Sequence, residues 1–159
     1  TQYMNKNSSE KESYIKAFAD AETLLDQDYA DYLIDDVSMS ILSRLNVDSL
    51  RKKRVQNGRL ILENIVEDKH LQKLVAHVSD DECPLFIPVK VPQAHRASMK
   101  QYLSENNVYC PSHWPNSPSH RLHSRTIDLY DSELSIVCDQ RYDAKDISKM
   151  TTIINNFSI

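Results

Sequence analysis

The sequence predicts an α+β fold, in which a helical N-terminal half is followed by a small three- to four-stranded sheet backed by helices. Two patterns support this prediction. Apolar residues recur at helical spacing through the first half, and short apolar runs alternate with amphipathic stretches in the second half. A third observation is the size: 159 residues with 40% hydrophobic and 26% charged residues are typical of one folded domain, or of one domain and a fragment.

The N-terminal half is predicted to be helical from residue 9 onward, after a flexible N-terminus over residues 1–8. Ser9-Glu10-Lys11-Glu12 is a capping-box pattern that begins a helix over residues 9–26. The acidic segment 26–36 is predicted to be an irregular connection. Ser38 is then expected to cap a short helix over 39–45, and Asn46 or Asp48 to begin a longer helix over about 47–67.

One stripe of this longer helix combines apolar and unusual residues: Val47, Leu50, Arg54, Gly58 and Ile61. A glycine on such a stripe predicts close packing at Gly58, and Arg54 is expected either to have a buried or interfacial partner or to extend its head to solvent. Lys52 lies in the string Ser49-Leu50-Arg51-Lys52, which resembles a Schiff-base lysine motif. Its place on the polar side of a helix excludes it, since such a lysine must be desolvated.

The C-terminal half is predicted to contain a short helix near 71–78 and then a strand over 84–91, with Pro88 at an edge or a bulge. A helix over 94–106 is expected to bury Met99 and Leu103 and to lead into a strand over 108–110. The polar segment 116–125 is predicted to be a loop. A strand over 134–142 follows, and Asp143 caps a last helix with an apolar stripe that includes Ile147 and Ile154.

The composition excludes several classes of protein. A single glycine, Gly58, stands where average usage gives roughly eleven, so no glycine-rich phosphate-binding loop fits in this chain. A net charge of −4 argues against nucleic-acid binding, and the sequence has no transmembrane run and no signal peptide. Three widely spaced cysteines, Cys83, Cys110 and Cys138, predict free thiols in a reducing cytoplasm.

The residues alone predict no catalytic group. No serine lies in a nucleophile-elbow motif, and adjacent carboxylates such as Asp35-Asp36 point apart on any regular element. A zinc site formed by Cys110, His113, His120 and His123 is an alternative, because soft nitrogen and sulfur ligands cluster there. Their spacing is poor for zinc, and a packed Cys110 with surface histidines is the competing interpretation.

Two strings resemble a known family. Tyr109-Cys110-Pro111-Ser112-His113-Trp114-Pro115 and Leu134-Ser135-Ile136-Val137-Cys138-Asp139-Gln140-Arg141-Tyr142 resemble the C-terminal part of DegT/DnrJ-type aminotransferases, which depend on pyridoxal phosphate. The segment 38–50, the pair Arg54 and Asn57, and the helix 143–157 also resemble that part, so the resemblance covers residues 12–157. Val137 departs from the family, which usually has proline there.

The resemblance implies the small domain of a fold-type I enzyme. It places the Schiff-base lysine and the phosphate-binding loop in a large domain upstream of Thr1, so that pyridoxal phosphate belongs to the full-length parent and not to this chain alone. The implied organisation is a helical segment over 9–67 that bridges from the large domain, followed by the small domain over 68–159. The implied substrate is a small molecule, an amino donor or a sugar.

The resemblance also implies roles for individual residues. Ser112, His113 and Trp114 follow a predicted strand and would face the substrate, and Arg141 would meet a carboxylate unless Asp139 or Asp143 binds it. Arg54, Asn57 and Gly58 are the candidates for packing or interface contacts. A surface made for the large domain would be partly apolar, so we expect a homodimer or a larger assembly. The alternatives are a stand-alone interaction module without cofactor chemistry and the metal-binding domain.

Overall fold

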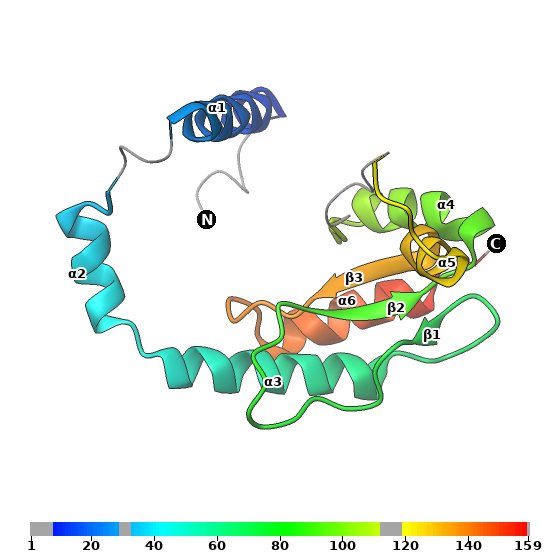
Figure 1. The fold of residues 1–159 in the computed structure, drawn as a ribbon. Helices are drawn as coiled ribbons and strands as arrows, with labels where there is room; N and C mark the ends of the chain where they lie inside the picture. The colour runs from blue at the N-terminus through cyan, green and yellow to red at the C-terminus, as the bar shows by residue number, and fades with distance from the viewer. Residues whose placement is uncertain (1–7, 29–32, 112–118, 159) are drawn as a thin grey trace. The chain divides into compact units, whose positions relative to one another are not determined.

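A computed structural model describes residues 8–28, 33–111 and 119–158 (Figure 1). The chain divides into two compact units, Thr1–Leu45 and Asn46–Ile159. Helices α1 (Ser8–Asp28) and α2 (Asp36–Arg44) belong to the first, N-terminal unit. All other elements, including helix α3 (Val47–Asn64), belong to the second, C-terminal unit. The predicted α+β class is confirmed, because the described residues contain six helices and a small antiparallel sheet.

The N-terminal unit consists of exposed helices. Every side chain described in α1, over residues 12–27, is exposed, and α2 buries none of its residues. The prediction that Ser38 caps α2 was wrong. Asp35 is the cap, and its carboxylate accepts hydrogen bonds from the backbone N–H groups of Val37 and Ser38, each at 2.9 Å. The helix therefore begins at Asp36, three residues before the predicted start at residue 39, since an earlier carboxylate already satisfies its first donors.

The C-terminal unit follows α3 with strands β1 (Gln72–Lys73) and β2 (Phe86–Lys90), helices α4 (Gln93–Glu105) and α5 (Ser124–Ser132), strand β3 (Glu133–Val137) and helix α6 (Ala144–Asn155). The strand order is β1-β2-β3, and both pairings are antiparallel. Ile87 pairs with Ile136 and Val89 with Leu134, and these four side chains are fully buried on one face of the sheet.

Helices α3, α4 and α6 pack on this buried face. Gly58 of α3 lies against Ile87, and Met99 of α4 and Ile154 of α6 line one small cavity. Tyr102 of α4 contacts Phe157, which follows α6, with tilted rings whose centroids are 5.4 Å apart. The expected burial of Met99, Leu103, Ile147 and Ile154 is confirmed. On the other face, Lys90 forms an ion pair of 2.7 Å with Asp128 of α5. No helix among the described residues is long and apolar enough to cross a membrane.

Pro88 occupies the central strand and not an edge, which corrects the prediction. Its carbonyl accepts a hydrogen bond from Leu74 N at 3.2 Å, and β1 ends at Lys73, just before Leu74. The N–H and C=O of one residue in an antiparallel strand point to the same side. The N–H that proline lacks would therefore point toward the end of the two-residue strand β1, where the ladder stops, so the proline removes no bond between β2 and β3.

Three other predictions of secondary structure were wrong. Residues 71–78 form no helix, because Asp68 accepts the N–H groups of His70 and Leu71 and Glu67 accepts that of Lys73, which takes donors that a helix would use. Residues 108–110 alternate buried and exposed side chains as a strand does, yet they are not a strand of the sheet. Helix α5 occupies part of the region expected to be a loop; its N-terminus is capped by His123.

Candidate functional site

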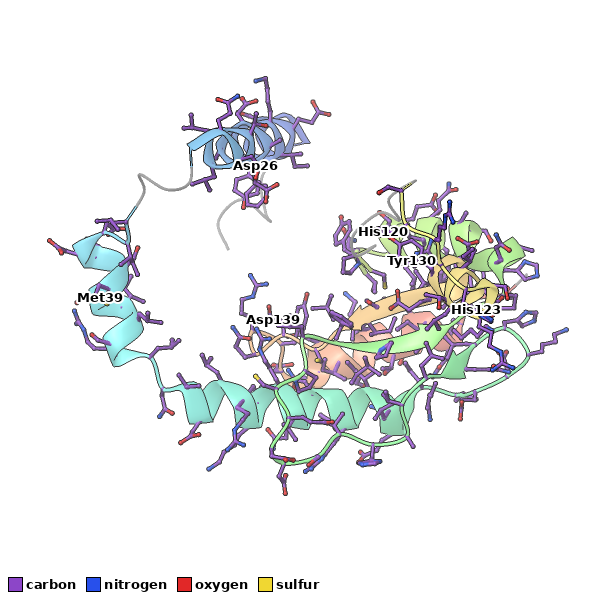
Figure 2. The ribbon with its side chains drawn as sticks, in the orientation of Figure 1. Asp26, Met39, His120, His123, Tyr130 and Asp139 are labelled. Atoms are coloured by element: carbon purple, nitrogen blue, oxygen red, sulfur yellow. The ribbon has the colours of Figure 1, made fainter. Side chains whose placement is uncertain are left out.

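The candidate site is built around a turn over residues 139–142, between β3 and α6 (Asp139 is labelled in Figure 2). Tyr142 N donates to Asp139 O at 3.2 Å, and Arg141 N donates to Asp139 Oδ1 at 2.8 Å. Directly after the turn, Asp143 and Asp146 form a capping box at the start of α6, as predicted for Asp143. The turn is therefore held by its own hydrogen bonds and by the helix that follows it.

Two residues of α3, which lies much earlier in the sequence, hold this turn in place. Asn57 is fully buried, and its Nδ2 donates to Asp139 O at 2.8 Å and to Tyr142 O at 3.1 Å. Arg54 Nε donates to Gln140 Oε1 at 2.7 Å. Arg54 and Asn57 lie one turn apart on the same helix face, so a single face of α3 holds three of the four turn residues.

Gly58 determines how closely α3 approaches the sheet. A Cβ atom at this position would lie 3.2 Å from Ile87 Cδ1, 3.3 Å from Val78 Cγ2 and 3.5 Å from Pro84 Cγ. Ile87 and Val78 are buried, so neither has room to withdraw. The glycine thus sets the distance between α3 and β2, and with it the position of Arg54 and Asn57 against the turn.

Arg141 is the candidate binding residue in the turn. Its Nε donates to Asp139 Oδ1 at 3.0 Å and its Nη2 to Asp139 Oδ2 at 2.8 Å, so Asp139, one of the two predicted alternatives, binds this guanidinium. The Arg141 side chain is 65% exposed and that of Asp139 is 15% exposed. Hydrogen bonds from Arg141 lower the pKa of the Asp139 carboxyl, in the direction that keeps it ionised. The result is a guanidinium held at the surface by a half-buried carboxylate.

A pocket of about 160 Å³ adjoins the turn through Tyr142. It lies between residues 106–109, which follow α4, the end of β3 at Val137, and helix α6. The two strings that carry the family resemblance, 109–115 and 134–142, therefore both contribute to it, the first through Tyr109 and the second through Val137 and Tyr142. Sequence reasoning did not find this pocket or the roles of Gln140 and Tyr142. The strings could be identified in the sequence, but the residues of α3 and α6 that lie beside them are evident only from the fold.

The other predicted site residues are placed as follows. Ser112, His113 and Trp114 lie outside the described residues. Cys110 is buried, which raises the pKa of its thiol to about 11, and His120 and His123 are exposed (Figure 2). His123 Nδ1 accepts the Arg125 N–H at 3.2 Å as the cap of α5. Among the described residues no group of three His, Cys, Asp or Glu side chains is placed to hold a metal ion.

The described residues do not fit pyridoxal phosphate. The one glycine of the chain lies inside α3, where side chains already occupy the space beside it, so it opens no cradle for a phosphate. Lys52, the residue nearest to a Schiff-base motif, is exposed on α3. A lysine that forms an imine is activated by desolvation, which this position does not provide.

No protein-family model matches the sequence, and no curated protein matches it. Among solved structures, the chain is similar to the crystal structure of an aminotransferase, TlmJ from Streptoalloteichus hindustanus, with a TM-score of 0.55 and 13% sequence identity. The match covers 75% of this chain and 34% of TlmJ, so the chain spans about a third of the length of that aminotransferase. At this identity the similarity establishes a shared fold: the chain is built like one part of an aminotransferase.

Proposed function

We propose that this chain is the C-terminal small domain of a pyridoxal-phosphate-dependent aminotransferase of the DegT type. The observation that supports the proposal most is that the fold and the candidate site point to the same kind of protein. The chain shares its fold with a third of an aminotransferase, and the strings that resemble the DegT family converge on one surface, where α3 holds the turn that carries Arg141.

The proposed task of the chain is to shape the substrate pocket. Bound in the large domain, pyridoxal phosphate supplies the electron sink of amino transfer. This chain contributes Arg141, whose planar guanidinium suits a carboxylate of the amino donor, and Asp139 orients that guanidinium in the free protein. His113 and Trp114, with Ser112, are proposed to face the same substrate from the segment after residue 111.

The partners we propose are the large domain and a second subunit. The apolar side chains of α1 and α2, such as Phe18, Leu25 and Ile41, are exposed in this structure, and apolar side chains on one helix face are the usual material of an interface. A homodimer of the parent would cover such faces. We place the protein in a reducing cytoplasm, where Cys83, Cys110 and Cys138 remain the free thiols that they are here.

The test is an assay of amino transfer by the polypeptide that the coding region specifies when it is extended upstream of Thr1. We expect a lysine-linked pyridoxal phosphate in the upstream part and amino transfer by the whole. Arg141→Gln should raise KM for the amino donor about tenfold or more, since a charged hydrogen-bond partner is lost. His113→Ala should change the donor KM or kcat. Lys52→Gln serves as the matched control and should change neither.

Two outcomes would overturn the proposal. One is a polypeptide without a cofactor-binding part, which would favour a stand-alone interaction module. The other is stoichiometric imine formation and amino transfer by the chain of Thr1–Ile159 alone, since the chain would then hold the cofactor that we assign to a separate domain.

A further inference from the structure

The pocket beside the turn has an apolar floor and a polar rim. Val108 is buried, and Val137, Met150 and Ile153 are half-buried around it. Its volume of about 160 Å³ lies below the range of roughly 300–1,000 Å³ that is usual for drug-sized ligands. The pocket therefore suits a ligand of a few heavy atoms with an apolar body.

Two residues that line the pocket, Tyr142 and Asn107, have uncharged polar side chains without a hydrogen-bond partner among the described residues. Tyr142 is half-buried, and this burial, together with the nearby Asp139, raises the pKa of its phenol. The hydroxyl is thus kept in the protonated form that can donate to an anion. Unpaired polar groups at the edge of an apolar pocket are typical of a site that fixes the orientation of a ligand.

The rim also carries one charge of each sign, from neighbouring turns of α6. Lys149 has no hydrogen bond or ion pair within the described chain, and Asp146 uses only Oδ2, which accepts Asp143 N at 3.0 Å. These two residues are three apart and both line the pocket, yet no ion pair joins them. An ammonium and a free carboxylate oxygen are therefore both available to a ligand at the same opening.

From this arrangement we propose that the pocket binds a free α-amino acid with an aliphatic side chain. The side chain lies on the floor of Val108, Met150 and Ile153. The ligand carboxylate accepts hydrogen bonds from Lys149 Nζ and the Tyr142 hydroxyl, and the ligand ammonium donates to Asp146 Oδ1. The site lies wholly in this chain and needs no pyridoxal phosphate, so it goes beyond the proposed function and does not depend on it.

The experiment is a titration of the full chain with L-leucine, followed by amide chemical shifts in NMR spectra. We expect saturable shifts at Val137, Tyr142 and Lys149 with a dissociation constant of ~1 mM, as befits so small a ligand. Isocaproate lacks only the ammonium and isoamylamine lacks only the carboxylate. Each should bind at least about tenfold more weakly than L-leucine, because isocaproate loses the hydrogen bond to Asp146 and isoamylamine loses those from Lys149 and Tyr142.

Variants separate a binding role from a structural one. Lys149→Gln should weaken L-leucine about tenfold and leave isoamylamine unchanged, whereas Tyr142→Phe should weaken L-leucine by a smaller factor. Lys145→Gln, an exposed lysine of the same helix outside the pocket lining, is the matched control and should bind as the wild type does. Unshifted spectra of the free variants verify that each is folded.

The proposal is overturned if L-leucine causes no saturable shifts, or if the saturable shifts lie away from this pocket. It is also overturned if L-leucine, isocaproate and isoamylamine bind equally well, or if Lys149→Gln binds L-leucine as the wild type does. None of these results bears on amino transfer by a longer polypeptide, which is measured separately.

Discussion

The two units of this chain use the same kind of helix with opposite results. Helix α1 has apolar residues at helical spacing, among them Tyr14, Phe18 and Leu25, and all three are exposed. Helix α6 shows the same spacing and buries Ile147 and Ile154 in the core that also contains the buried side chains of the sheet. A 3.6-residue period therefore predicts that a helix has an apolar face, but it does not predict whether the same chain supplies the surface that covers it.

The difference follows from what each helix has to pack against. The C-terminal unit has a sheet whose buried face, with Ile87 and Ile136 at its centre, offers a continuous apolar surface. The N-terminal unit consists of helices only in its described part, and α2 has nine residues. Isolated helices shorter than about 12–15 residues are marginal in water, so α2 depends on its cap at Asp35 and on contacts beyond its own length.

The largest expected difference in stability is between two alanine substitutions, one of a leucine in each unit. Leu103 is fully buried in the core of the C-terminal unit, and Leu42 is 55% exposed on α2. Leu103→Ala should lower the free energy of unfolding by about 2–5 kcal/mol, because it removes buried apolar surface and leaves a cavity. Leu42→Ala should change it by less than about 0.5 kcal/mol. Urea denaturation followed by circular dichroism measures both, and equal losses would contradict the contrast between the units.

The next effect concerns the contact between α3 and the turn. Asn57→Ala removes two part-buried hydrogen bonds and leaves the carbonyls of Asp139 and Tyr142 without their Asn57 donor, so we expect a loss of about 1–3 kcal/mol. Its neighbour Gln56 is exposed, which makes Gln56→Ala the matched control with a change near zero. Denaturation measures the loss. Slower hydrogen exchange of the turn amides in the Asn57→Ala protein than in the wild type would argue against this contact.

A smaller, pH-dependent effect is expected at Asp139. Hydrogen bonds from Arg141 lower its pKa in the folded state, so its stabilising contribution is present above the unfolded value of about 3.9 and is lost as the pH falls through the lower folded pKa. In Asp139→Asn that part of the acid sensitivity should disappear. Unfolding curves between pH 2 and 5 measure it, and unchanged pH dependence in the variant would show that the ion pair contributes nothing.

Much of the fold was predictable, because it depends on local patterns. The helices around Met99 and Ile147 carry a regular apolar stripe, and Asp143 is a strong cap, so these elements were predicted near their true bounds. Helix α5 was not predicted, since it is only nine residues long and begins inside the polar segment 116–125 that was expected to be a loop. The two-residue strand β1 was missed for a similar reason: it is fixed by side-chain hydrogen bonds and not by a hydrophobic pattern.

The candidate site was predictable only in part. Arg54 and Gly58 were singled out because an arginine and a glycine are unusual on an apolar stripe, and Asn57 and Arg141 were identified from the family resemblance. The partners of Arg54 and Asn57 lie more than 80 residues away in the sequence, in a turn with no periodicity of its own. Such contacts depend on the register between β2 and β3, which a single sequence does not specify.

The smallest effect on stability is expected from the largest change, deletion of residues 1–45. Asn46, which caps α3 by accepting Ser49 N at 2.9 Å, is retained in the shortened chain, so the first turn of α3 keeps its cap. Because no described side chain of α1 or α2 is buried, the C-terminal unit should lose less than about 0.5 kcal/mol of unfolding free energy.

Self-association of the full chain, measured by sedimentation, should decrease on deletion, because the exposed apolar faces of α1 and α2 are removed. Leu25→Ala with Leu42→Ala in the full chain is the control, and it should weaken association while retaining both helices. A shortened chain that unfolds, or that associates as strongly as the full chain, would mean that the two units depend on each other or that another surface mediates assembly.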